Sequence, residues 1–171
     1  MIDPPDRPPE RRVVLYIRQH ASAALVEGLC RLVDRVRRLE TDGIAAVVVT
    51  TWGPVTPALE RLGDTGPSVS LTADSFQAWA DSEGYTLRPA FTRHETSSLL
   101  ESRPSTELRV PTACLAVYVD GALTFVAPCS DGERTHSVAA CLDALEAGRT
   151  EPFGPFRPHE PPREDARAVL E

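Results

Sequence analysis

Apolar residues along the chain fall into runs and stripes that predict alternating strands and helices. The runs VVLYIRQ, beginning at Val13, and IAAVVVTTW are rich in β-branched residues and show little polar alternation. Such runs are typical of central strands that are covered on both faces. Between them, apolar residues repeat with helical spacing from Leu25 to Leu39, and Ser22 and Gly43 suit the two helix ends. The pattern predicts a βαβ unit with two parallel strands.

The last third of the core predicts a β-hairpin followed by a helix. The segments TACLAVYV and ALTFVAP flank Asp120 and Gly121, a dipeptide that favours a two-residue hairpin turn. Thr135 or Ser137 can then cap a helix that ends before Gly148. Its apolar face, at helical spacing, consists of Val138, Cys141, Leu142 and Leu145.

The middle of the chain has weaker patterns. Residues 53–71 contain several glycines and prolines and predict a long connection. A short helix is expected to start between residues 72 and 74 and to end at Gly84. Residues 85–91 then alternate like a weak strand, and residues 96–107 have the composition of a loop.

Prolines concentrate at both ends of the chain. Residues 1–12 and 149–171 together hold nine of the 16 prolines, and such segments cannot bury enough apolar surface to offset the entropy lost on ordering. We therefore expect one α/β domain over residues 13–148, between two disordered Pro-rich tails. The C-terminal tail also contains PxxP spacing between Pro152 and Pro158, which a Pro-rich docking motif would use.

The charge balance argues against a general surface for polyanions. All 18 basic residues are arginines, 25 residues are acidic, and the formal net charge is −7, whereas non-specific nucleic-acid affinity depends on neutralising phosphates. No apolar run approaches the roughly 20 residues that span a bilayer, and the N-terminus lacks the pattern of a signal peptide. We expect a cytoplasmic protein that does not bind a membrane, and we favour a protein partner over a nucleic-acid partner.

The order of the elements resembles the thioredoxin-like fold. VPTACLAVYVDGALTF, followed by an amphipathic helix, is similar to the C-terminal half of that fold, in which a Pro-Thr step precedes a hairpin. VVLYIRQHASAALVEGLCRLV resembles its first strand and active-site helix. The resemblance covers residues 13–52 and 108–148 and implies a three-layer α/β/α domain. The proline of the Pro-Thr step is usually cis in that family.

Four residues are candidates for contact with a protein partner. A cis Pro111 would preserve the substrate-binding edge that the resemblance implies, with Val110 beside it, whereas a trans proline would only start a strand. His20 lies at the start of the first helix, either as an acid/base partner of Ser22 or as a solvent-facing side chain beside a capping serine. Trp52 is either a core anchor or an exposed interface residue.

The cysteines decide how far the resemblance extends to redox chemistry. Residues 19–22 read QHAS where active thioredoxins carry Cys-x-x-Cys, so a two-thiol exchange cannot run there. Cys30 and Cys141 are expected to pack as small hydrophobes. Cys114 and Cys129 lie on the two hairpin strands and are the candidate redox pair. A type I′ turn would make them diagonal neighbours, with Cys114 opposite residue 127, and a type II′ turn one residue later would place them opposite each other.

Other enzyme signatures are absent from the sequence. It contains no P-loop, no nucleophile elbow and no dinucleotide fingerprint, and its four histidines are too scattered for a structural zinc site. We therefore expect no catalytic residue, no cofactor and no metal. The stretches VVLYIRQ, VTTWG and APCSDGERTHSV are also similar to small haloarchaeal proteins that carry a helix-turn-helix domain label.

Three functional hypotheses follow from these patterns. The first is a non-enzymatic interaction domain for regulation or assembly, with a protein partner and a homodimer as one option. The second is a DNA-binding regulator of helix-turn-helix type, although residues 53–71 are longer than the short turn of that motif. The third is a thiol-disulfide redox protein that uses Cys114 and Cys129.

Overall fold

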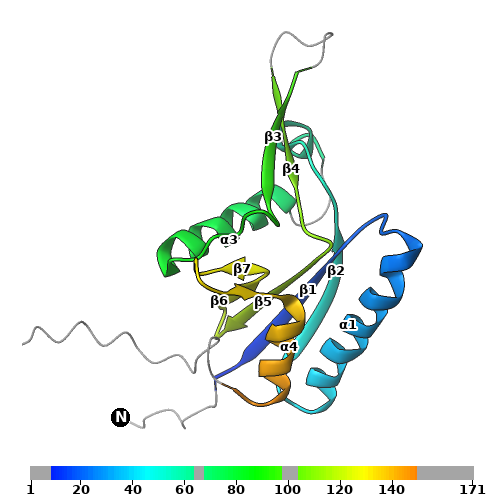
Figure 1. Cartoon of the computed structure of the whole chain (residues 1–171), viewed down its shortest axis with the longest axis vertical. Helices are drawn as coiled ribbons and strands as arrows, with labels where there is room; N and C mark the ends of the chain where they lie inside the picture. Colours follow the sequence, from blue (N-terminus) through cyan, green and yellow to red (C-terminus); the bar gives the residue numbers. More distant parts are fainter. Residues whose placement is uncertain (1–8, 64–67, 98–103, 150–171) are drawn as a thin grey trace, which may run out of the picture.

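The computed structural model describes residues 9–63, 68–97 and 104–149, and Figure 1 shows how their helices and strands are arranged. One sheet contains four strands in the order β2-β1-β5-β6. These are β1 (Arg11–Arg18), β2 (Ala46–Trp52), β5 (Ala113–Val119) and β6 (Ala122–Ala127). β1 runs parallel to β2 and antiparallel to β5, and β6 is antiparallel to β5. The predicted βαβ unit and the predicted hairpin therefore share one sheet.

Helices cover both faces of this sheet. α1 (Ala23–Thr41) and α4 (Val138–Glu146) lie side by side, whereas α3 (Val69–Glu83) packs separately (Figure 1). Ile17 of β1 lines a groove with Leu29 of α1, while Tyr16 contacts Phe76 of α3 at a ring-centroid distance of 5.7 Å. Because successive strand residues point to opposite faces, α1 and α3 lie on opposite sides. The chain is a mixed α/β domain with three layers, as expected.

A second hairpin projects from this body (Figure 1). It consists of β3 (Thr92–Thr96) and β4 (Ser105–Arg109), which pair only with each other as regular strands. The short helix α2 (Pro57–Glu60) lies near it, and Val55 bridges to Leu108 of β4. The expectation of a strand at residues 85–91 is therefore wrong, since the strands lie at 92–96 and 105–109. Of the loop expected over 96–107, residue 96 and residues 105–107 belong to these strands, and residues 98–103 lie outside the described residues.

The remaining short strands lead into the last helix. β7 (Cys129–Ser130) pairs with β8 (Thr135–His136) directly before α4. Ser137 precedes α4, and its hydroxyl oxygen accepts a hydrogen bond from the amide of Ala140 at 3.1 Å. The predicted capping serine and the buried face of this helix are both confirmed.

α3 begins earlier than its apolar spacing predicts. Ser68 caps it by accepting a hydrogen bond from the amide of Leu71 at 3.2 Å, so the helix starts at Val69 rather than between residues 72 and 74. It ends as expected, because Gly84 adopts a left-handed φ of 78° that favours glycine. The buried residues of α3 are Ala73, Phe76, Trp79 and Ala80.

The predicted boundaries of the domain need one correction. β1 already begins at Arg11, and the amide of Glu10 donates a hydrogen bond to the carboxylate of Asp120 at 2.9 Å. Residues 11 and 12 therefore belong to the sheet. The rest of the predicted N-terminal tail up to residue 8, and the C-terminal tail from residue 150 with its PxxP spacing, lie outside the described residues. In the described part of the chain, no helix combines the length and the apolar character that crossing a bilayer requires.

Candidate interaction groove

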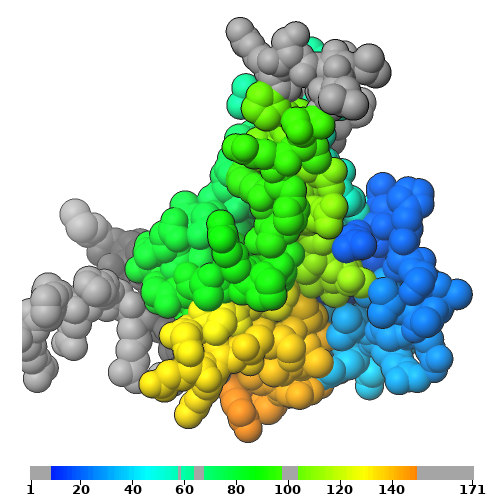
Figure 2. Space-filling model, turned by 45° about the horizontal axis from the view of Figure 1, so that its top comes forward, coloured from blue at the N-terminus to red at the C-terminus, as the bar shows by residue number. Residues whose placement is uncertain are grey.

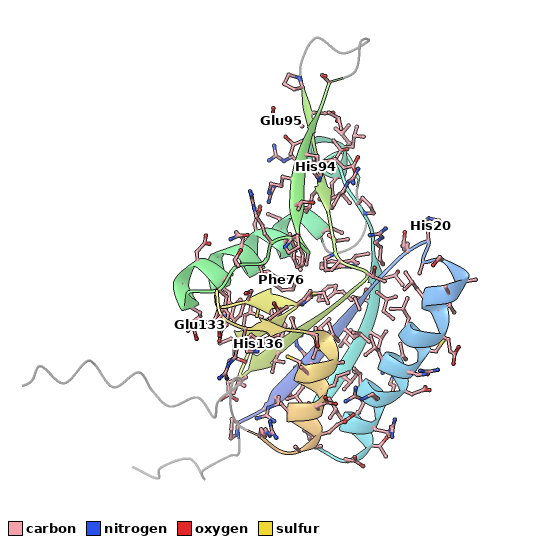
Figure 3. The ribbon with its side chains drawn as sticks, viewed as in Figure 1. His20, Phe76, His94, Glu95, Glu133 and His136 are labelled. Carbon is pink, nitrogen blue, oxygen red and sulfur yellow. The ribbon has the colours of Figure 1, made fainter. Side chains whose placement is uncertain are left out.

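The four candidate interaction residues are brought to one end of the sheet. β1 and β2 both finish there and β5 begins there, so His20, Trp52, Val110 and Pro111 come together from distant parts of the chain. The amide of Gln19 donates to the carbonyl of Trp52 at 2.7 Å, which joins the ends of the two parallel strands. Figure 3 shows His20 at this end of the molecule.

Two of these four residues are core residues rather than surface residues. Trp52 is 3% exposed and Val110 is 2% exposed. The indole nitrogen of Trp52 donates to the carbonyl of Pro111 at 3.3 Å, and its ring lies 4.6 Å from that of Tyr16. Trp52 is therefore the core anchor of this end of the sheet, and only His20 and the half-buried Pro111 reach the solvent.

Pro111 is not a cis proline. The cis peptide bonds among the described residues precede Pro89 and Pro128, and the bond between Val110 and Pro111 is trans. Pro111 lies two residues before the start of β5 and outside the strand, so its missing N–H breaks no ladder hydrogen bond. The expectation that a cis Pro111 preserves a substrate-binding edge is therefore wrong.

The accessible feature at this end is a groove between the end of β1 and α1, which we call the α1–β1 groove. Its volume is about 430 Å³, within the range of about 300–1,000 Å³ that is usual for binding sites. Its lining is largely apolar and consists of Ile17, Ala21, Val26, Leu29, Cys30 and Val33. The charged or ionisable side chains that line it are Arg18, His20 and Asp34.

The groove exists because α1 is buried unevenly along its length. Val36 and Leu39 in the C-terminal half are fully buried, whereas Leu25 and Val26 in the N-terminal half are each 47% exposed. Leu29 is the buried residue nearest to them. Figure 2 shows the blue segment that contains the end of β1 and the start of α1 at the surface of the molecule. Contiguous exposed apolar residues are a feature of protein and ligand interaction sites.

Within the described part of the chain, the ionisable side chains of the groove have no ion-pair partner, whereas several arginines of α1 outside the groove do. Arg31 pairs with Glu27, Arg37 pairs with Glu40, and Arg35 reaches across to Asp143 and Glu146 of α4. None of the ion pairs among the described residues includes the three ionisable side chains of the groove. The guanidinium of Arg18 donates one long hydrogen bond, of 3.5 Å, to the carbonyl of Val110. The groove therefore has charged groups that are available to a partner.

Cys30 is exposed and lines the groove, so the expectation that it packs as a small hydrophobe is wrong. The other three cysteines are free and buried. Burial raises the pKa of the Cys129 thiol to about 12 and also raises the pKa values of the Cys114 and Cys141 thiols. Thiols that stay protonated near neutral pH are poor nucleophiles.

The hairpin register separates the candidate redox pair. Asp120 and Gly121 have φ values of 50° and 82°, as a type I′ turn requires. A register shift between Val117 and Tyr118 then moves the pairing by one residue, so that Leu115 rather than Cys114 lies opposite Ala127. Cys114 and Cys129 are therefore not directly opposite each other.

Within the described residues, no three His, Cys, Asp or Glu side chains gather as a metal site.

Comparison with known proteins assigns the chain to a family. A family model described as a helix-turn-helix domain matches residues 5–150. The chain belongs to this helix-turn-helix domain family. Its label agrees with the similarity that the sequence stretches indicate. Comparison with curated proteins and with solved structures gave no match.

The helices of this family member depart from the geometry of the usual DNA-binding motif. In the described residues, α2 and α3 are the one pair of successive helices without a strand between them. α2 spans four residues, and residues 61–68 separate it from α3, whereas the motif uses a turn of about 3–4 residues. α3 contains Asp74, Asp81 and Glu83 and no basic residue. Such a helix would repel phosphates.

Proposed function

We propose that this helix-turn-helix family member is a non-enzymatic protein-interaction domain, used in regulation or assembly, that binds its partner in the α1–β1 groove. The observation that carries the proposal is the groove itself, in which apolar side chains face the solvent beside ionisable side chains without ion-pair partners. A groove of this composition gains affinity from burying its apolar lining and specificity from pairing its charges.

The chemistry of the groove defines the partner. It should present apolar side chains that cover Val26 and Leu29, with an acidic group for Arg18 and a basic group for Asp34. The same reasoning favours a segment that combines apolar residues with a few charges over a strongly charged peptide, because most of the lining is apolar.

We further propose a thioredoxin-like arrangement that has lost its thiol chemistry. The arrangement is supported by the first strand and helix, the hairpin and the closing helix, which contribute to one three-layer body. The loss of chemistry is supported by residues 19–22, which contain no cysteine, and by the raised pKa values of the buried thiols. A domain of this fold without reactive thiols keeps its surfaces for protein contact, which is the role that we propose.

DNA binding is the second candidate, because membership of the helix-turn-helix domain family favours it. Several features weigh against it. The net charge is −7, and three of the arginines of α1 are held in ion pairs. A labelled duplex library titrated at several salt concentrations tests this candidate. Affinity that falls steeply with salt would support DNA binding in place of the groove proposal.

Selection of binding peptides tests the proposed function directly. The full chain is used to select from a phage-displayed library of random dodecapeptides. Enriched peptides should combine apolar residues with charges, and their binding should fall at least tenfold with Val26→Asp, which places an unpaired charge in the groove. The matched control is Leu71→Asp, because Leu71 is also exposed, at 68%, but lies on α3 outside the groove lining.

Two outcomes would overturn the proposal. One is the absence of any enriched peptide. The other is a set of peptides whose affinity changes equally with Val26→Asp and Leu71→Asp. Circular dichroism of both variants, compared with the wild type, establishes that each retains the fold.

A further inference from the structure

The charges of the α1–β1 groove are divided between its two ends. Asp34 lies eight residues after Val26 on α1, which corresponds to about 12 Å along the helix. Arg18 and His20 belong to the end of β1 and to the connection that leads into the start of α1. The groove therefore has a cationic end, formed by Arg18, near the N-terminus of α1 and an anionic end at Asp34.

This division makes the groove complementary to itself. A two-fold axis that crosses the middle of the groove places α1 of a second copy antiparallel to α1 of the first. The cationic end of each groove then meets the anionic end of the other, so that Arg18 of each copy faces Asp34 of its partner. Because the contact is isologous, one such pair implies a second, symmetric pair.

The apolar lining fits the same arrangement. Val26, Leu29 and Cys30 lie between the two charged ends and would pack across the axis, where the exposed parts of Leu25 and Val26 are covered as well. A parallel arrangement of the two helices would instead bring like charges together at both ends. The charge pattern therefore favours an antiparallel pair of copies over a parallel pair.

We infer that the partner in the α1–β1 groove is a second copy of this chain, which forms an antiparallel two-fold dimer through Arg18 and Asp34. The inference rests on the proposed function, since it names the occupant of the same groove. The exposed surface of the residues that line the groove is smaller than the roughly 800 Å² that each partner buries in a standard interface. The dimer is therefore weak and depends on protein concentration and on salt.

Charge reversal tests the pairing. Sedimentation velocity of the full chain over a range of concentrations measures the dimer constant for the wild type, Asp34→Arg, Arg18→Glu and the double variant. Each single reversal should weaken the dimer by about tenfold, because attraction becomes repulsion at two symmetric pairs. The double variant exchanges the signs at both ends and should return to within about threefold of the wild type.

A matched control separates the pairing from the change in net charge. Asp42→Arg alters the net charge by the same amount as Asp34→Arg, but Asp42 is an exposed residue at the C-terminal end of α1, outside the groove lining. It should leave the dimer constant unchanged within about twofold. Circular dichroism shows whether each variant is folded. Asp34→Asn removes the charge without reversing it, so its dimer constant should lie between those of the wild type and Asp34→Arg.

The outcomes separate this inference from the proposed function. A chain that stays monomeric up to about 1 mM, or a dimer that responds equally to Asp34→Arg and Asp42→Arg, overturns the homodimer. Loss of the dimer in both single variants without recovery in the double variant overturns the pairing of Arg18 with Asp34. In each of these cases, peptide selection that depends on Val26 would still support a groove that binds a different protein.

Discussion

Thiol reactivity should distinguish Cys30 sharply from the other three cysteines. Cys30 is exposed, whereas Cys114, Cys129 and Cys141 are between 0% and 3% exposed. The perturbation is an excess of a chromogenic disulfide reagent added to the folded full chain at pH 8. We expect one fast thiol per chain in the wild type and none in Cys30→Ser.

The size of the difference can be estimated for Cys129. With a pKa of about 12, about one molecule in 10,000 carries the thiolate at pH 8, whereas a thiol with an ordinary pKa of about 8.5 is about one-quarter ionised. Ionisation alone therefore slows the reaction of Cys129 by about three orders of magnitude relative to an ordinary thiol. Burial slows it further, because the reagent must wait for the structure to open.

The time course of absorbance after mixing measures these rates. Urea serves as the control, because unfolding should release all four thiols at comparable rates. Two fast thiols that survive in Cys30→Ser would refute the reasoning, as would a disulfide between Cys114 and Cys129 in the protein isolated without reductant. Either result would restore the redox hypothesis.

Three further predictions concern stability and are measured by urea denaturation. Phe76→Ala should cost about 3–5 kcal/mol, because the fully buried ring of Phe76 joins α3 to the sheet; a cost below about 1 kcal/mol would mean that α3 is not seated there. Ser137→Ala should cost about 1 kcal/mol through loss of its cap, and Ser22→Ala much less, because Ser22 makes no side-chain cap bond; equal costs would contradict this. The hydrogen bond from Arg35 lowers the pKa of Glu146. The stability that this interaction contributes is therefore fully present above the ordinary pKa of 4.5 and is lost as the pH falls through the lowered pKa. Arg35→Leu should make the free energy of unfolding fall less over this pH range, and an unchanged dependence on pH would contradict the prediction.

The sequence predicts the elements that have a buried face. β1, β2 and the hairpin of β5 and β6 are apolar runs, and α1 and α4 carry apolar stripes. Burial between the sheet and the helices enforces most of these patterns, so they can be recognised without the structure. β2 is the exception: its sequence is typical of a central strand covered on both faces, but it is an edge strand in which Val48 is 44% exposed. The hairpin turn at Asp120 and Gly121 is the type I′ turn, one of the two that the sequence leaves open. The register shift between Val117 and Tyr118 has no sequence signal.

The projecting hairpin shows why other elements escape prediction. β3 reads TRHET and β4 reads STELR, and of these ten residues only Leu108 is buried. A ribbon with little buried surface has no need for alternating apolar residues, so its composition resembles that of a loop. Conversely, residues 85–91 place Leu87 and Phe91 in the core without forming a strand, and their alternation is misleading for that reason.

The groove was only partly predictable for a related reason. The helical spacing of α1 predicts a single apolar stripe, and it cannot show that the stripe is buried at Val36 and exposed at Leu25. His20, a candidate because of its expected place at the start of the first helix, is among the residues that line the groove. Arg18, Cys30 and Asp34 are missed because their significance depends on a cavity that only the tertiary packing creates.

The packing of α3 bears on how the helix-turn-helix family label should be connected to function. Its apolar face is committed to the core, and its first amides are already engaged by Glu60, which accepts hydrogen bonds from the amides of Val69 and Ser70. A recognition helix would need those amides and an exposed basic face for phosphates and bases. α3 offers neither, because an internal carboxylate occupies its first turn and its charged residues are acidic. α1 lines the groove in which apolar side chains lie beside ionisable side chains without ion-pair partners among the described residues. Family membership and protein binding are therefore compatible, provided that the functional helix is α1.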